Sequence, residues 1–456
     1  MNHPFDTIAA VSTPAGKGGV ALIRLSGNDA LSIASRIFKT HHPCKWEKNR
    51  LYHGWIVDGE EPVDEVVVLC YLAPHSYTGE QVVEICCHGS PFISERILNL
   101  LFDCGAKPAE PGEFTQRAFL NGRIDLAQAE AVADLINAKT EASRRVAAYQ
   151  LEGRLSDKIN FIREELIESC GLLELELDFG EEEVLFASRE ELAKTIKNAQ
   201  AAIQELLDSY QKGRVCREGF RVAIVGPPNA GKSSLLNCLV EKERAIVTDI
   251  PGTTRDTIDE MIDIDGVLFT ITDTAGMRES LDPIEQEGVR RSRAAVDTAD
   301  LVLWVTDGSR QQHKEKDTFF ETITSRKKHI LLINKSDLIK QKEKAGEQKE
   351  SAETIHISAL TGHGINKLIK ALKVAAFSEE MPREGEIFIT RARHANALKE
   401  AAAHIENARV SLRESQSQEF IAMDLRAAMV LLGEIIGKVT TDDILNKIFS
   451  DFCIGK

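Results

Sequence analysis

The segment 226–234, GPPNAGKSS, combines residue types and spacing that suit phosphate binding. It fits the pattern G-x-x-x-x-G-K-[ST], with a β-rich apolar run, 220–225, before it and an apolar helical run after it. In such a loop the glycines let backbone N–H groups surround a phosphate, Lys232 neutralises oxygens of the β- and γ-phosphates, and the Ser233 hydroxyl can bind Mg²⁺. The segment therefore predicts a nucleotide-phosphate site between a strand and a helix.

Three later motifs, each following a predicted strand, extend this site toward a purine base. DTAG, 273–276, offers an acidic residue that can hold Mg²⁺ through water, and an amide at Gly276 that can meet the γ-phosphate. In NKSD, 334–337, the Asp337 carboxylate can accept hydrogen bonds from guanine N1 and N2, which adenine cannot donate. A polar site of this kind rejects the wrong partner by roughly 10⁴ to 10⁵. SAL, 358–360, can contact the base through its amides, and the set predicts guanine specificity.

In this order, the motifs resemble the GTPase superfamily over residues 219 to about 378. The resemblance implies a Ras-like P-loop domain, a mostly parallel sheet with helices on both faces. It also places PGTTRD, 251–256, at switch I, with Thr254 as a second hydroxyl ligand of Mg²⁺. The implied GTP-binding residues are Asn229, Ala230, Gly231, Lys232, Ser233, Ser234, Thr248, Asp249, Ile250, Pro251, Gly252, Thr253, Thr254, Asp273, Thr274, Ala275, Gly276, Asn334, Lys335, Ser336, Asp337, Ser358, Ala359 and Leu360.

The residue that would orient the attacking water is not the usual one. Ras-like GTPases carry a glutamine after the DxxG motif, whereas this chain has Met277, which cannot hydrogen-bond a water in that way. Glu285 is the candidate, although without family knowledge a solvated charge is the simpler interpretation. No obvious internal arginine finger stands out among Arg255, Arg278 and Arg290, so a monovalent cation could supply the positive charge.

Longer strings narrow the resemblance. AIVTDIPGTTRD, Asn229 and DTAGMRE resemble the cation-dependent GTPases. RLSG, PGEFTQRAFLNGRIDLAQAEAVADLI and the terminal FCIGK resemble the MnmE (TrmE) family of tRNA modification GTPases, with matches from about Thr7 to Lys456. This resemblance implies Mg²⁺ at Ser233 and Thr254 and assistance to water by Glu285. It also implies a K⁺ ion held by Asn229, Thr248, Ile250 and Thr253.

The same resemblance implies a folate site in an N-terminal domain similar to those of aminomethyltransferases. The contacts to 5-formyl-tetrahydrofolate, or a related folate, fall on Arg24, Glu84, Arg123 and Lys456. A carboxylate suits the amidine-like edge of a pterin, and cations suit the glutamate tail; composition alone would make each of these residues a surface ion pair. Cys453 has three interpretations: a prenylation signal, which the final lysine disfavours, a small residue ending a helix, or a thiol near the folate.

Hydrophobic periodicity predicts how these sites are organised. The chain is expected to be a multidomain α/β protein with an α+β N-terminal domain (1–118), a helical domain in two parts (119–218 and 379–456) and the GTPase domain inserted between them (219–378). In the first domain, strands are predicted at 19–25, 65–72 and 81–87 and helices at 30–38 and 91–102. In the inserted domain, strands are predicted at 220–225, 268–272, 301–305, 329–333 and 354–357. Helices at 393–412, 421–436 and 441–452 follow.

Charge and composition constrain the partners. With 56 basic and 71 acidic residues the net charge is −15, so the overall field does not attract a phosphate backbone. The nine cysteines form no C-x-x-C motif, which favours a reducing compartment. No apolar stretch approaches the ~20 residues that span a bilayer, and the first residues lack signal-peptide features. A cytoplasmic protein without a membrane contact is expected.

The function implied by the resemblance is a K⁺-dependent GTPase that acts as a homodimer with the flavoprotein MnmG, which carries FAD. Together they would add an aminomethyl or carboxymethylaminomethyl group to C5 of the wobble uridine, position 34, of certain tRNAs, in a complex expected to be a heterotetramer. Two alternatives stay open. One is a ribosome-assembly or signalling GTPase that binds RNA without modifying it, which the acidic chain disfavours. The other is a stand-alone folate-dependent aminomethyltransferase with a regulatory GTPase domain.

Overall fold

The computed structural model describes residues 6–40, 46–47, 50–178, 188–245, 259–273, 293–309, 327–339, 354–377, 385–450 and 452–456. These residues form two compact units. The first comprises Met1–Ala133, Gln150–Ala199 and Glu400–Lys456, and the second comprises Asp134–Tyr149 and Gln200–Lys399. No helix in the described parts of the chain combines the length and the hydropathy that a membrane span requires.

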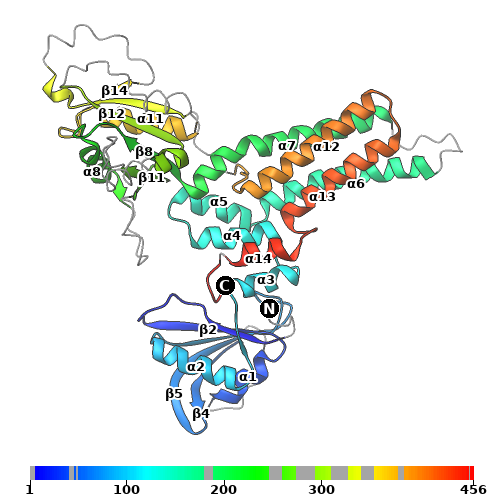
Figure 1. The fold of residues 1–456 in the computed structure, drawn as a ribbon. Helices are drawn as coiled ribbons and strands as arrows, with labels where there is room; N and C mark the ends of the chain where they lie inside the picture. The colour runs from blue at the N-terminus through cyan, green and yellow to red at the C-terminus, as the bar shows by residue number, and fades with distance from the viewer. Residues whose placement is uncertain are drawn as a thin grey trace, which may run out of the picture. The chain divides into compact units, whose positions relative to one another are not determined.

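A seven-stranded sheet forms the N-terminal part of the first unit, in the order β3-β4-β5-β6-β2-β1-β7. Figure 1 labels its strands β2, β4 and β5. Its neighbouring strands are antiparallel except for the short β1–β7 pair, which is parallel. Helices α1 and α2 pack on it through Ile33 and Ile97, which join Ile23, Leu25 and Ile85 in one core. The elements are β1 (Ile8–Val11), β2 (Val20–Ser26), α1 (Ala30–Ile37), β3 (Phe38–Lys39), β4 (Arg50–Asp58), β5 (Glu61–Tyr71), β6 (Val82–His88), α2 (Pro91–Asp103) and β7 (Lys107–Pro108).

The predicted strands and helices of this domain are confirmed, since β2, β5, β6, α1 and α2 overlap the five predicted ranges. The structure adds strands that periodicity did not predict. β4 contains Gly54, where a Cβ would collide with the Lys39 carbonyl oxygen because the two strands approach closely. This glycine interrupts the apolar pattern by which a strand is recognised. β1 is short and half alanine, which is a weak strand signal.

Helices that precede the inserted segment pack against helices that follow it in the first unit. The Arg163 guanidinium in α6 donates to the Met429 carbonyl oxygen in α13 at 3.1 Å, and the Cys170 thiol contacts the Ala422 carbonyl oxygen at 3.8 Å. The chain before and after the inserted segment thus forms one helical layer. The helices are α3 (Glu113–Leu120), α6 (Arg154–Asp178), α13 (Gln418–Ile436) and α14 (Asp442–Ser450). Residues of both units are found in α4 (Leu126–Ile136), α5 (Glu141–Leu151), α7 (Arg189–Glu218) and α12 (Ala392–Arg413).

The second unit contains a seven-stranded sheet in the order β14-β13-β12-β8-β11-β10-β9. The five predicted strands are confirmed, and they pair in parallel as the alternation of strands and helices indicated. An antiparallel hairpin, β10–β11, was not predicted, although its turn carries Asp265-Gly266, a strong hairpin signal. The elements are α5 (Glu141–Leu151), β8 (Phe220–Val225), α8 (Lys232–Lys242), β9 (Arg244–Ala245), β10 (Asp259–Ile264), β11 (Val267–Asp273), β12 (Leu301–Asp307), β13 (His329–Asn334), η1 (Ser336–Leu338), β14 (Thr354–His356) and α11 (Ile365–Phe377).

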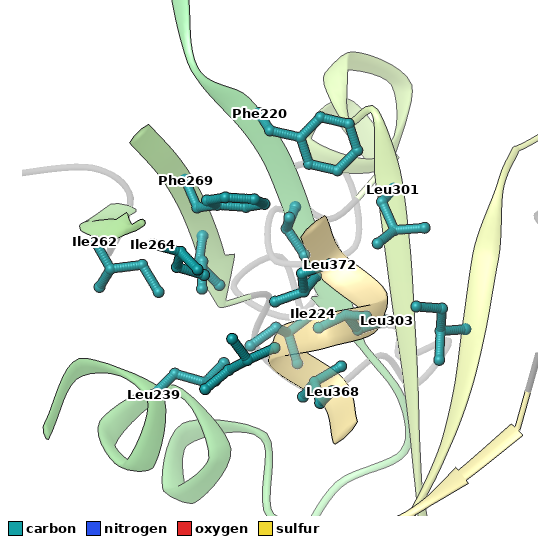
Figure 2. Close-up of a cluster of buried hydrophobic side chains, with 14 of the residues drawn as sticks. Phe220, Ile224, Leu239, Ile262, Ile264, Phe269, Leu301, Leu303, Leu368 and Leu372 are labelled. Carbon is teal, nitrogen blue, oxygen red and sulfur yellow. The ribbon is translucent and has the colours of Figure 1, made fainter. Parts of the chain in front are cut away.

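Side chains from both faces of this sheet are buried under helices. On one face Ile224, Phe269 and Leu303 pack against Leu239 of α8 and Leu372 of α11, as Figure 2 shows. On the other face alternate residues of the same strands pack against the helical residues 293–298. Because described helices cover both faces, the strands read as continuous apolar runs, and open α/β sheets of this kind bind ligands at the carboxyl ends of their strands.

Candidate functional site

The loop between β8 and α8 has a shape fixed by its backbone. A Cβ at Gly226 would collide with the Val305 carbonyl oxygen, and one at Gly231 would collide with the Asn334 side chain, so neither position accepts a larger residue. The Lys232 ammonium, at the first residue of α8, donates to the carbonyl oxygens of Gly226 at 3.0 Å and Pro227 at 3.1 Å. The loop thus closes over its own lysine at the carboxyl end of a strand.

Burial lowers the pKa of Lys232, and the nearby Asp273 carboxylate partly opposes this shift. A buried ammonium without an ion-paired anion is costly. Phosphate oxygens at this position would replace weak carbonyl partners by strong charged ones. The lysine is therefore better satisfied with a polyphosphate than without one.

Ser233 and Asp273 meet beside this loop. The Ser233 hydroxyl donates to Asp273 Oδ2 at 2.7 Å, while Asp273 Oδ1, at the end of β11, is buried and has no partner among the described residues. A hydroxyl and a carboxylate with an unused oxygen are ligands suited to Mg²⁺ and its bound waters. The arrangement fits the divalent ion that a GTPase uses.

Asn334 joins three parts of the site. Its side-chain amide donates to the Ala230 carbonyl oxygen at 2.8 Å, and its Oδ1 accepts from the backbone N–H groups of Lys335 at 2.8 Å and Ala359 at 3.0 Å. The residue is 2% exposed. It therefore positions the phosphate loop and the 334–337 and 358–360 segments relative to one another.

The Lys335 ammonium binds the Asn229 carbonyl oxygen at 2.9 Å and Asp307 Oδ2 at 2.7 Å. Burial opposes ionisation of Asp307, but hydrogen bonds from Lys335 and Ser309 outweigh it and lower the pKa of this carboxyl. Asp307 was not among the predicted site residues. The available signal was its position at the carboxyl end of the third parallel strand, where Asp273 and Asn334 also lie on their strands.

Asp337 lies in the short helix η1 and is held by the neighbouring loop. The Ser358 hydroxyl donates to Asp337 Oδ1 at 2.5 Å, and Ser358 itself is fully buried. One carboxylate oxygen is thus fixed by the protein, which orients the other for a ligand. Leu360 is 87% exposed and projects from the same loop.

The remaining predicted residues of this site lie outside the described residues. They are Thr248, Asp249, Ile250, Pro251, Gly252, Thr253 and Thr254 of the predicted switch I, Thr274, Ala275 and Gly276 of DTAG, and Glu285. Ser234, in the first turn of α8, is described and exposed.

A second constellation lies in the first unit, where Arg24 and Glu84 are directly opposite each other on β2 and β6. Arg24 Nε donates to Glu84 Oε1 at 2.9 Å, and the guanidinium lies 5.1 Å from the centre of the Tyr77 ring and 5.7 Å from that of Phe114. Arg24 Nη1 is buried and has no partner among the described residues. This ion pair therefore retains an unused donor in an aromatic setting.

The carboxyl-terminal tail reaches the same place. The Lys456 carbonyl oxygen accepts from the Phe114 backbone N–H at 3.1 Å, and the Ser12 hydroxyl donates to the Gly455 carbonyl oxygen at 3.0 Å. Burial and then the charge of Arg24 lower the pKa of the Lys456 ammonium, while Glu84 and Cys453 oppose the shift. These pKa effects require the last lysine, the Arg24–Glu84 pair and the exposed Cys453 thiol to be neighbours.

A cavity of about 570 Å³ is lined in part by Tyr71, Ser76, Glu84 and Arg123. Arg123 Nε donates to the Ser76 carbonyl oxygen at 3.3 Å, and the Ser76 hydroxyl is buried without a partner among the described residues. Burial, followed by the charge of Glu84, raises the pKa of the Tyr71 hydroxyl. The structure thus places the predicted residues Glu84 and Arg123 on one cavity of small-molecule size.

Comparisons with known proteins cover nearly the whole chain. The family model for the GTP-binding protein TrmE N-terminus matches residues 7–123, and the model for the MnmE helical domain matches residues 126–453. The tRNA modification GTPase MnmE of Chlorobaculum tepidum is 44% identical over 463 residues, covering 99% of this chain and 98% of the relative. That of Natranaerobius thermophilus is 42% identical over 456 residues, covering 99% of each.

Among solved structures, Era in complex with MgGDPNP and nucleotides of 16S ribosomal RNA is 27% identical. The match covers 41% of this chain and 66% of that chain, with a TM-score of 0.29. The family models and the full-length relatives show that this chain belongs to the MnmE (TrmE) family of tRNA modification GTPases.

Proposed function

We propose that this chain hydrolyses GTP to drive the modification of a tRNA wobble uridine. The observation that carries the nucleotide part is the convergence of Lys232, Asp273, Asn334 and Asp307 at the carboxyl ends of four neighbouring parallel strands. This edge is where open α/β sheets bind nucleotides. The full-length relatives, which are tRNA modification GTPases, support the rest.

The described residues divide the recognition of GTP among them. Lys232 neutralises the β- and γ-phosphates, and the backbone of the preceding loop donates hydrogen bonds to them. Asp337 accepts from guanine N1 and N2, while Ser358 holds the carboxylate in place. The Ser358–Leu360 backbone contacts the base edge. Mg²⁺, held by Ser233 and Thr254 with Asp273 acting through water, would neutralise charge on the phosphates.

Hydrolysis needs a positioned water and an additional positive charge. Met277 cannot orient the water, so we assign that task to Glu285. The family's potassium ligands fall on Asn229, Thr248, Ile250 and Thr253, and a K⁺ ion there would supply the charge that an arginine finger supplies elsewhere.

The cavity in the first unit fits a folate. Glu84 can accept from the pterin edge, Arg24 has an unused guanidinium N–H, and Arg123 and Lys456 add positive charge for the glutamate carboxylates. The unpartnered Ser76 hydroxyl is a further polar group for the ligand. The bound 5-formyl-tetrahydrofolate, or a related folate, would supply the one-carbon unit, and the exposed Cys453 thiol lies near it with no assigned step.

The proposal includes a homodimer and the FAD-carrying partner MnmG. With a net charge of −15 the chain is poorly suited to attract tRNA by itself, so MnmG would provide most of the basic surface. The described cysteines are free thiols, which agrees with a reducing cytoplasm as the site of the reaction.

Mass spectrometry of wobble nucleosides from cells lacking this protein tests the proposal. We expect loss of the C5 aminomethyl-type modification and its return when the chain is supplied. Unchanged nucleosides would refute tRNA modification and favour a ribosome-assembly or signalling GTPase. Modification by the purified chain without MnmG would instead favour the stand-alone folate-dependent aminomethyltransferase.

A further inference from the structure

An ion cluster in the second unit joins three segments of the chain around Asp134. This residue lies in the last turn of α4, and its Oδ1 accepts from Arg217 Nε at 2.9 Å and from Arg391 Nη2 at 2.8 Å. Arg217 is the next-to-last residue of α7, and Arg391 immediately precedes α12. The carboxylate is 10% exposed, and the two arginines are 27% and 19% exposed, so all three charges are largely removed from solvent.

These segments are the chain's connections to the inserted module. The chain enters the module from α7 and leaves it through residues 385–391, which lead into α12. The entering and leaving segments are in contact, since the Ile389 backbone N–H donates to the Ser209 hydroxyl in α7 at 3.0 Å. A Cβ at Gly213 would collide with the Ile389 carbonyl oxygen, so the two backbones are in close contact there. Through its two arginine partners, Asp134 connects the end of α4 to the segments by which the chain enters and leaves the module.

The segment that begins at Asp134 is also held to the module at its other end. The Ala142 backbone N–H, in α5, donates to the Gly266 carbonyl oxygen in the turn between β10 and β11 at 3.1 Å. The segment from Asp134 to Ala142 is therefore bonded to the β10–β11 turn, which leads into the strand that ends at Asp273, and to the two segments by which the chain enters and leaves the module. A displacement of that strand has a direct route to α4, α7 and α12, each of which continues along the chain into the first unit.

The cluster can also rearrange without losing its charge balance. Both arginines bind Oδ1, while Asp134 Oδ2 is buried and has no partner among the described residues. A carboxylate offers about four lone-pair positions, so one arginine can move to Oδ2 while the other keeps its bond. Elements with two discrete arrangements are a physical basis for coupling between distant sites.

We propose that Asp134 is a positioning residue that couples nucleotide turnover in the second unit to tRNA modification through α4, α7 and α12. This role rests on the proposed function. Asp134 contacts neither the phosphate loop nor the base-binding segments among the described residues, so it acts on the coupling and not on the hydrolysis of GTP.

The test compares Asp134→Asn with Glu218→Gln. Glu218 binds the same Arg217, through Nη1 at 3.0 Å, but it is 38% exposed and lies outside the three-way cluster. For Asp134→Asn we expect GTP hydrolysis within twofold of the unmodified chain and tRNA modification at least tenfold slower. Glu218→Gln should leave both rates unchanged. Equal slowing of both reactions, or normal modification, by Asp134→Asn would overturn the proposal.

Two further measurements separate coupling from a structural role. The double variant Asp134→Arg with Arg391→Asp keeps one carboxylate and two guanidiniums in the cluster, and it should recover at least a third of the lost modification rate; no recovery counts against the proposal. The rate of hydrogen exchange of the α13 amides should change when GDP and aluminium fluoride bind to the chain without substitutions. It should not change in Asp134→Asn, although the variant should bind the nucleotide with equal affinity. This measurement needs no tRNA, so it tests the role of Asp134 even if the chain without substitutions does not modify tRNA. That second result would refute the proposed function and not the role of Asp134.

Discussion

Replacement of Asp337 by asparagine should change the base specificity of the nucleotide site. The change keeps the size of the side chain and the acceptor that faces Ser358, but it puts an N–H₂ group opposite the guanine N2 donor. Hydrogen bonds to a charged group contribute about 1.5–3 kcal/mol each, so losing two costs about 3–6 kcal/mol. At 1.4 kcal/mol per decade, GTP affinity should fall by about 10² to 10⁴.

The lower end of this range is the better expectation. Asp337 is exposed before the base binds, and its bonds with a ligand therefore replace bonds with water. Xanthosine triphosphate carries a carbonyl oxygen where guanine has its amino group, so it can accept from the new amide and should bind the variant more tightly than GTP does.

Fluorescence titration with labelled nucleotides measures this exchange of specificity. The control is Asp265→Asn, which alters an exposed carboxylate at the β10–β11 turn of the same module and should leave both affinities unchanged. A loss of GTP affinity below tenfold, or an equal loss for the xanthine nucleotide, would refute the assignment of Asp337 to the guanine edge.

Three other outcomes follow from the two sites. GTP hydrolysis in K⁺ and in Na⁺ at equal ionic strength should differ by at least tenfold, because no obvious arginine finger stands out in the sequence and the proposed K⁺ ion would supply that charge; equal rates would reject the cation as the source of charge. Arg24→Gln should weaken binding of 5-formyl-tetrahydrofolate by about tenfold or more in equilibrium dialysis, through loss of a charged hydrogen bond, and leave GTP hydrolysis unchanged. Folate binding should also weaken as pH rises through the lowered pKa of Lys456, since only its charged form attracts the carboxylates; in Lys456→Met this part of the pH profile should disappear.

The parallel sheet and its phosphate loop were predictable because their signals are local. An apolar run such as 220–225, followed by a glycine-rich loop and an apolar helix, defines a strand–loop–helix unit without reference to the rest of the chain. The β10–β11 hairpin was available from Asp265-Gly266 but was missed, since three of the six residues of β10 are acidic and the segment reads as polar. In the N-terminal domain, β1 and β7 are short, and their pairing across a long stretch of chain leaves no periodic pattern.

The sequence by itself determined the family and predicted the phosphate loop and the guanine-reading carboxylate, because these depend on residue types at fixed local spacing. The tertiary structure alone decided that Asp307 anchors Lys335, that the last lysine reaches the Arg24–Glu84 pair, and that Asp134 binds two arginines from distant segments. Each of these contacts joins residues far apart in the chain through one or two pairs of charged groups. Such pairs have no period or motif, so only the folded backbone, which brings the strand ends and helix ends together, specifies them.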